Sequence, residues 1–195
     1  MSRPEALTAS ASAPGARRGS VWLSALFDPA GLIARHLDGF GVLPALAVSG
    51  LAFGTISLQA ALDLARTSTW DSSALALLVL RGTLLGTAGV ALVAVAAWLL
   101  SRPFSGSHGL GWTVRAFGGA YGNALIYGLF GLALNLFLGW NTAVSCGVTG
   151  LLWALGPLFV AVRELAGGRV GVAALLSGIS GALLLIGWVQ FGVGP

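Results

Sequence analysis

The ionisable side chains inside the apolar part of the chain are the first candidates for chemistry. Asp63 and Arg66 lie three residues apart, so on a helix they share one face and can pair. Arg81 stands alone in an apolar stretch, and a charge inside a membrane often marks a functional site. Two interpretations of Arg81 stay open. In the first, Arg81 forms an anion or proton site on the outer side of the membrane. In the second, Arg81 is structural, and its side chain extends outward to water or pairs with Asp63 or Asp71.

Two amides, Asn123 and Asn135, fall in another apolar segment. An amide surrounded by hydrocarbon needs a hydrogen-bond partner, so each is expected to bond across helices. We favour a structural role for both. A site for a lipid or a small polar ligand, flanked by Tyr121 and Tyr127, is the alternative.

Catalytic and metal-binding patterns are missing from the sequence. No base accompanies the serines of the apolar segments, and His36 and His108 both lie outside these segments. The single cysteine, Cys146, cannot form an internal disulfide or a zinc site. We therefore expect no catalytic residue, no cofactor and no metal ligand, and a protein that is not an enzyme.

Composition indicates the class of protein. The chain has 195 residues, of which 56% are hydrophobic and 8% charged, whereas a soluble domain has about 25% charged residues. Its apolar segments approach the ~20 residues that a helix needs to cross a bilayer. The prediction is an all-α membrane protein with five transmembrane helices, at about 41–62, 82–100, 116–138, 142–162 and 170–191. A start near Ala74 is the alternative for the second of them.

The N-terminal forty residues are predicted to lie outside the five-span domain of residues 41–195. Residues 1–20 are rich in Ala, Ser, Pro and Arg and are typical of a disordered tail. Residues 21–40 are predicted to form a short amphipathic helix, with Asp28 as N-cap and Pro29 at the first helical position. This helix either lies in the membrane interface, anchored by Trp22, or simply leads into the first span.

The arginines predict the orientation. All ten basic residues are arginines, and the net charge is +4. With five crossings, eight arginines fall on one side and two on the other, and positive residues favour the cytoplasmic side. The N-terminus is predicted inside and the C-terminus outside, in the cytoplasmic (inner) membrane of a bacterium. No basic cluster interleaved with aromatic residues occurs, so nucleic acid is excluded as a partner.

Small residues recur four positions apart in every predicted span, which lets helix backbones approach closely. This spacing predicts a compact bundle. Besides the lipid bilayer, the predicted partners are a second copy of the chain or other membrane proteins. The predicted helix-packing residues are Gly50 and Gly54, Gly82 and Gly86, Gly118 and Gly122, Ala143 and Gly147, and Ser177 and Gly181.

Over about residues 22–191 the chain resembles the Ypt-interacting-protein (Yip) domain family of five-span membrane proteins. The resemblance is carried by LFDPAGLIARH, LLSRPFSGSHGLGWTVRAFGGAYGNALIYG and LLWALGPLFVAVRELAGGRVGVAALLSG. Eukaryotic members associate with prenylated small GTPases and help organise secretory membranes, and the resemblance brings no catalytic residues. It implies a non-enzymatic, membrane-embedded interaction or membrane-organising protein. The alternative is a subunit of a transporter or permease for a small solute or lipid.

Overall fold

The fold is given by a computed structural model, which describes residues 14–67, 71–104, 106 and 108–193. The predicted all-α class is confirmed, with five helical stretches that are long and apolar enough to cross a membrane among these residues. In chain order they are Val42–Thr67, Ser72–Phe104, Leu110–Leu138, Ala143–Leu165 and Val170–Phe191.

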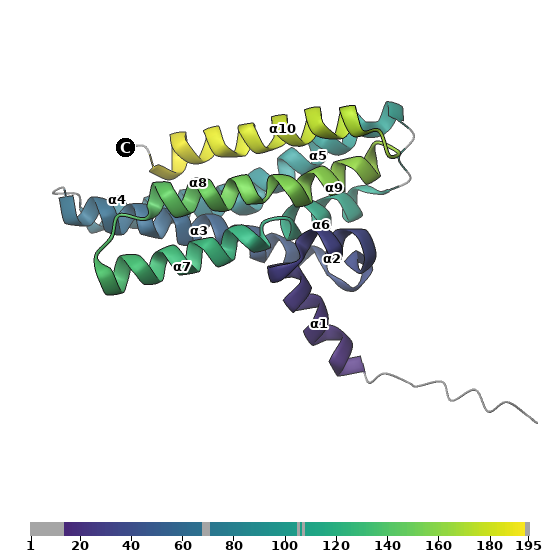
Figure 1. The fold of residues 1–195 in the computed structure, drawn as a ribbon. Coiled ribbons are helices and arrows are strands. Elements are labelled where there is room, and N and C mark those ends of the chain that lie inside the picture. Colours follow the sequence, from purple (N-terminus) through teal and green to yellow (C-terminus); the bar gives the residue numbers. More distant parts are fainter. Residues whose placement is uncertain (1–13, 68–70, 105, 107, 194–195) are drawn as a thin grey trace, which may run out of the picture.

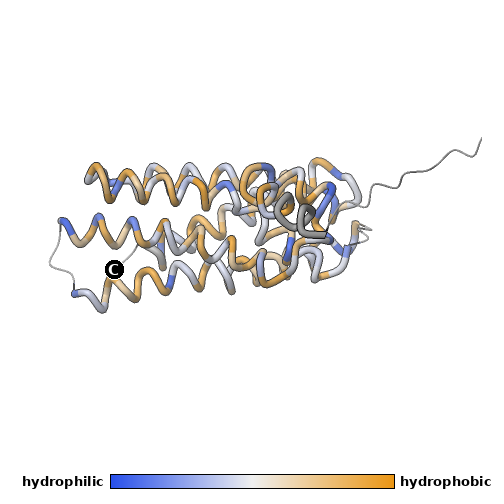
Figure 2. The backbone as a smooth tube through the Cα atoms, turned by 90° about the horizontal axis from the view of Figure 1, so that it is seen from below, coloured by the Kyte–Doolittle hydropathy of each residue, from blue (hydrophilic) through white to orange (hydrophobic). Residues whose placement is uncertain are grey.

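The five stretches run roughly along one another in a bundle (Figure 1). One end of the bundle, which we call the proximal end, carries α1 (Pro14–Phe27), α2 (Pro29–Arg35), η1 (Leu37–Gly39) and the connections before α6 and α10. The other, distal end carries the connections between α3 and α4 and between α7 and α8. Hydrophobic residues extend along the helices, with hydrophilic residues mostly toward the two ends (Figure 2).

The first stretch is one uninterrupted α-helix, α3 (Val42–Thr67). The last stretch consists of α10 (Val170–Gly187), which continues into the π segment η4 (Trp188–Val193). The second stretch consists of α4 (Ser72–Leu84), the π segment η2 (Leu85–Gly89), α5 (Val90–Ser101) and η3 (Arg102–Phe104). The third divides into α6 (Leu110–Gly119) and α7 (Gly122–Leu138), and the fourth into α8 (Ala143–Trp153) and α9 (Leu155–Leu165).

Proline explains the break between α8 and α9. Pro157 is the third residue of α9 and has no backbone N–H, so the carbonyl of Trp153 loses its helical partner. Pro44 in α3 has less effect, because it is the third residue of its helix, where backbone N–H groups have no helical acceptor in any case.

Two predicted span starts, at residues 82 and 116, were wrong. The second helical stretch begins at Ser72, close to the alternative start near Ala74, and the third begins at Leu110. Both predictions placed an arginine, Arg81 or Arg115, at or outside the start of its span. A single long side chain does not end a helix, since arginine is a good helix former and can extend its guanidinium away from the apolar surface.

The predicted disordered tail was wrong in its second half, because α1 begins at Pro14. Ala25 is buried, and Val21 and Leu26 pack against the core. Most helical stability in a protein comes from tertiary packing, so such contacts can hold a helix whose first half contains Gly15 and Gly19. Residues 1–13 of the predicted tail lie outside the described part of the chain.

The cap and the two faces predicted within residues 21–40 are confirmed, but the segment is not one helix, because it comprises the end of α1, then α2 and η1. Asp28 caps α2, with its side chain accepting a hydrogen bond from the Gly31 N–H at 2.9 Å, and Pro29 is the first helical residue. The apolar face is buried and packs against the bundle, whereas the charged face is exposed. The buried residues are Leu32, Ile33, Leu37 and Phe40, and the exposed ones Arg35, His36 and Asp38.

Glycines bring α3 into close contact with α4 and with the π segment η2. A methyl group added at Gly86 would lie 2.5 Å from the Ser49 carbonyl oxygen and 3.0 Å from the Cα of Gly50. One added at Gly82 would collide with the Ser57 hydroxyl. The close approach expected from the small-residue spacing is therefore confirmed at this contact.

The remaining predicted packing residues also lie inside the bundle. A methyl group at Gly54 would meet Thr83, at Gly118 the Ala45 backbone, at Gly122 the Ala25 carbonyl, at Gly147 the Ile56 side chain and at Gly181 the Leu155 side chain. Ala143 and Ser177 are buried. These residues pack helices of one chain together, and self-association through them stays a prediction.

Candidate functional site

Polar side chains meet at the distal end, where α3, α7 and the start of α8 come together. Gln59 and Asp63 lie four residues apart on one face of α3, and both point toward α7 and α8. Their partners come from Asn135 on α7, the Thr142 side chain and the first backbone N–H of α8. We call this set of residues the distal polar cluster.

Gln59 is fully buried, and both ends of its amide are hydrogen-bonded. Its Nε2 donates to the Gly128 carbonyl at 2.7 Å, and its Oε1 lies 2.9 Å from the Thr142 hydroxyl. That hydroxyl also lies 2.8 Å from the Gly131 carbonyl, so its single proton serves one of two acceptors. A methyl group at Gly131 would collide with Gln59 Oε1, so glycine is needed for the amide to fit.

Asp63 connects three helices through its carboxylate. Oδ1 accepts a hydrogen bond from Asn135 Nδ2, and Oδ2 accepts one from the Ala143 N–H at 3.3 Å. Ala143 is the first residue of α8, where unpaired backbone N–H groups favour a negative charge. The interhelical hydrogen bond predicted for Asn135 is thus confirmed.

Arg66 provides the positive charge that pairs with the Asp63 carboxylate. Its NH1 lies 3.9 Å from Asp63 Oδ1, and its NH2 donates to the Asn135 backbone carbonyl at 2.6 Å, in the last turn of α7. A cation is favoured there, because the helix dipole places partial negative charge at the last carbonyls of a helix. The predicted pairing of Asp63 with Arg66 is confirmed, and the two charges complement the ends of two different helices.

Asn123 does not join the cluster. The structure shows no interhelical hydrogen bond for it among the described residues, so the predicted bond was not found. Its half-buried side chain instead lines a shallow hollow of about 200 Å³ with Phe27, Ile126, Tyr127 and Trp153.

Arg81 lies inside α4, as the tenth residue of that helix, and is exposed. The pairing with Asp63 or Asp71 that one interpretation expected is not observed, because both carboxylates bond elsewhere. Asp71 precedes α4 and accepts hydrogen bonds from Ser72 and Ser73. The Ser73 bond, the largest cause, holds the pKa of Asp71 below its ordinary value.

Sequence reasoning missed Gln59 and Thr142. Gln59 lies four residues before Asp63, so the spacing that brings residues to one helix face could have found it. Thr142 directly precedes α8, and nothing local in the sequence indicates that its hydroxyl reaches Gln59 on α3.

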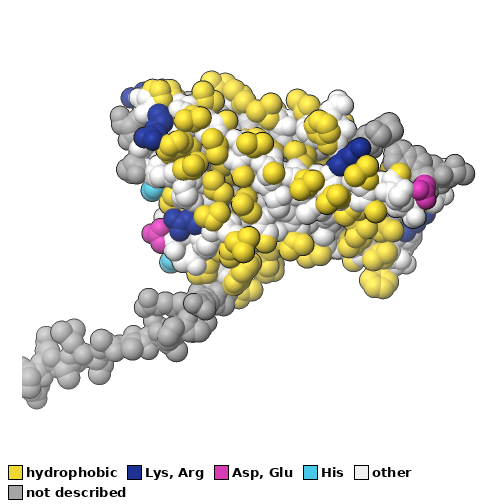
Figure 3. Space-filling view, turned by 180° about the vertical axis from the view of Figure 1, so that it is seen from behind, with side chains coloured by type: hydrophobic (Ala, Val, Ile, Leu, Met, Phe, Trp, Pro, Cys, Tyr) yellow, Lys and Arg dark blue, Asp and Glu magenta, His cyan; other side chains and the backbone are white. Residues whose placement is uncertain are grey.

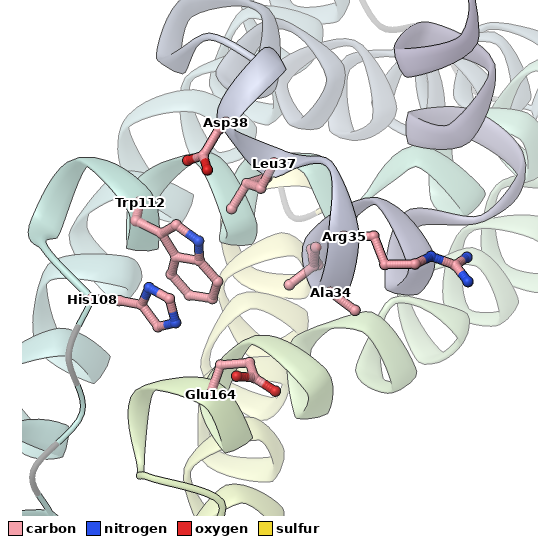
Figure 4. Close-up of a pocket in the computed structure, with 8 residues that line it drawn as sticks. Ala34, Arg35, Leu37, Asp38, His108, Trp112 and Glu164 are labelled. Carbon is pink, nitrogen blue, oxygen red and sulfur yellow. The ribbon is translucent and has the colours of Figure 1, made fainter. Parts of the chain in front are cut away.

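A second polar site is a hollow of about 160 Å³ at the proximal end (Figure 4). It lies between α2, η1, the start of α6 and the end of α9, and we call it the proximal hollow. Its lining residues are Ile33, Ala34, Arg35, Leu37, Asp38, His108, Trp112 and Glu164.

The aromatic wall of the proximal hollow is held by several contacts. The His108 ring stacks on Trp112, with centroids 3.9 Å apart, and the His108 carbonyl accepts a hydrogen bond from Trp98 Nε1 at 3.2 Å. Arg102 lies over the other tryptophan, 4.1 Å from the Trp98 ring. The wall is therefore fixed by ring stacking and by a bond to backbone.

The charges around this hollow are mostly paired. Arg35 turns away from Trp112 toward Asp28, at 3.1 Å, and Arg115 lies 3.6 Å from Asp38. Within the described residues, no ion pair engages Glu164, whose exposed carboxylate stands at the edge of the hollow. The hollow thus combines an aromatic wall with an unpaired negative charge.

No group of three or more His, Cys, Asp or Glu side chains in the described ranges could hold a metal ion. At the distal polar cluster, the side chains bond to one another and to backbone groups, which is an arrangement that joins helices.

The fold and these sites define a multi-pass, all-α membrane protein. Compared with models of protein families, with curated proteins and with solved structures, the chain shows no match. These comparisons do not test the resemblance to the Yip domain family, which stays a prediction from the sequence.

Proposed function

We propose that the chain is a non-enzymatic membrane protein of Yip type that acts as a membrane-embedded interaction or membrane-organising protein. The observation that carries the proposal is the way α1, α2 and η1 fold back onto the proximal end, where they leave an aromatic hollow bordered by Glu164. Ala34 and Glu164 are exposed in the lining of this hollow, and aromatic residues such as Trp112 are enriched at protein–protein interfaces.

The interior of the bundle supports a static role. Gln59 donates a hydrogen bond to the Gly128 carbonyl of α7, and the Asp63 carboxylate accepts bonds from α7 and α8. Interhelical hydrogen bonds of this kind hold helices together.

Site-specific cross-linking tests the proposal. A photo-activatable residue at Ala34, which is exposed and lines the proximal hollow, should give discrete protein adducts in native membranes. The matched position is Leu183, which is exposed on α10 and far from that hollow, and it should give lipid adducts. Glu164→Arg should abolish the protein adducts from Ala34. Identical adduct patterns at both positions would refute the proposal.

A transporter or permease subunit is the second candidate, because three of the five spans are interrupted. The π segment η2, the turn between α6 and α7, and the break before Pro157 all occur within spans, and discontinuous helices often border substrate sites in transporters. Solute uptake by vesicles that contain the purified protein, and none by empty vesicles, would favour this function.

A further inference from the structure

We infer that the surface beside Arg81 binds an anionic phospholipid, with the lipid phosphate on the guanidinium and one acyl chain in the adjoining groove. The groove lies between the second span and the C-terminal π segment, with a volume of about 280 Å³, and its lining is apolar apart from Arg81. The lining residues are Arg81, Leu84, Leu85, Gly89 and Phe191.

The charge of Arg81 is unneutralised within the described part of the chain. Among the arginines whose side chains are described, three pair with acids and two lie over aromatic rings. Arg81 and Arg163 have neither kind of partner among the described residues. Asp63 and Asp71, the acids of the distal half, bond to Asn135, Ala143 and serine hydroxyls instead.

The surroundings of Arg81 are those of a lipid-facing surface. Leu80 and Leu84 are exposed by 54% and 53%, and Phe191 by 59%, in a helical bundle with five potential spans. Figure 3 shows a face whose middle is covered by hydrophobic side chains. Acidic side chains lie at the ends of this face, and basic side chains also occur among the hydrophobic ones. A guanidinium in such a surface needs an anion, and phosphate accepts two parallel hydrogen bonds from it.

The depth of Arg81 suits a phosphate. The span Ser72–Phe104 has 33 residues, so it is about 50 Å long at about 1.5 Å per residue. That length exceeds the ~30 Å hydrocarbon layer by about 20 Å, or about 10 Å at each end if shared equally. Arg81 lies about 14 Å from the start of the span. It is therefore about 4 Å inside the hydrocarbon boundary, where an extended arginine reaches the headgroup layer.

The direction of the groove suits an acyl chain. Leu84, Leu85 and Gly89 follow Arg81 by three, four and eight residues, so they lie progressively deeper in the bilayer. Gly89 has no side chain, and a methyl group there would lie 2.7 Å from Leu85 Cδ1. The groove thus continues inward from the charge, as a lipid tail continues inward from its phosphate.

Lipid binding to purified protein tests the inference. Native mass spectrometry would compare dioleoyl-phosphatidylglycerol with dioleoyl-phosphatidylcholine, which share acyl chains and differ in net charge. Wild-type protein should retain phosphatidylglycerol preferentially. Arg81→Gln should reduce that preference about tenfold, because a bond to a charged group corresponds to about one order of magnitude in affinity. Arg163→Gln removes the same charge at the proximal end and should leave the preference unchanged.

Two further measurements separate the alternatives. Inorganic phosphate in excess should not displace phosphatidylglycerol, whereas displacement would assign the site to a free anion and overturn the lipid. Phosphatidylglycerol with a photo-activatable acyl chain should label wild-type protein within residues 84–89, which requires no variant to fold. Equal lipid preference in wild type and Arg81→Gln, or labelling spread evenly over the spans, would overturn the inference.

Discussion

The Asn135 amide on α7 donates a hydrogen bond to the Asp63 carboxylate on α3, joining residues 72 positions apart in the sequence. The same carboxylate accepts the first N–H of α8, so one side chain connects three of the five spans. Its side chain is 17% exposed, which leaves little water to replace a lost partner. Because of these bonds, Asp63 is the first residue at which we would measure the effect of a substitution on stability.

We expect Asp63→Ala to lower the free energy of unfolding by about 2 kcal/mol, because bonds to charged groups contribute about 1.5–3 kcal/mol. Unfolding in mixed micelles of dodecyl maltoside and dodecyl sulfate would measure this change. A double-mutant cycle with Asn135→Ala should show a coupling above about 0.5 kcal/mol, the usual limit of additivity for independent sites. Asp38→Ala is the control, because Asp38 is 97% exposed and its one ion pair is weak. Fully additive effects of the two cluster substitutions would contradict the assignment.

Gln59→Leu should cost about 1–2 kcal/mol of unfolding free energy, since interhelical hydrogen bonds in membranes contribute up to roughly that amount. The substitution keeps the side chain buried but leaves the Gly128 carbonyl without the Nε2 donor. Gln190→Leu changes the chain's other glutamine, which is exposed, and should have little effect. Equal effects of the two variants in the micelle assay would show that the buried bonds of Gln59 are unimportant.

Gly82→Leu should separate α3 from α4, because the new side chain would collide with Ser57 and approach the Phe53 carbonyl. Overpacking of this kind costs about 1–3 kcal/mol. Gly178→Leu is the matched control on α10, where nothing lies within 4 Å of an added methyl group. Thermal unfolding in detergent should show a lower midpoint for the first variant only, and a comparable loss in both would argue against the close contact.

The sequence was sufficient to predict the class and the number of spans, because hydrocarbon leaves few alternatives to apolar helices of about 20 residues. The cap at Asp28 was also predictable, since its bond to Gly31 is local. The same holds for the Asp63–Arg66 pair, whose spacing alone places both residues on one helix face.

Residues joined through the tertiary fold could not be predicted from spacing. Thr142 reaches Gln59 across 83 positions, and that contact depends on how α8 packs on α3. The starts of two spans were misplaced for another reason. Arg81 and Arg115 were treated as boundary markers, although α4 and α6 both continue before them.

Labelling with a membrane-impermeant maleimide should establish the orientation. In a Cys146→Ala background, His36→Cys reports the proximal end and Asn141→Cys the distal end, and both native residues are exposed. The positive-inside rule leads us to expect reaction of Asn141→Cys in intact cells and of His36→Cys only in opened cells. Labelling of both from the same side would be incompatible with five crossings.

The π segment Leu85–Gly89 sets the rotational phase between the two halves of the second span. A π turn contains one more residue than an α turn, so one residue can be removed there while the stretch rewinds as an α-helix and α4 and α5 stay nearly in phase. The same deletion within α5 would turn the residues on its two sides by about 100° relative to each other. Single-residue changes of length should therefore be tolerated better during evolution at Leu85–Gly89 than elsewhere in this span.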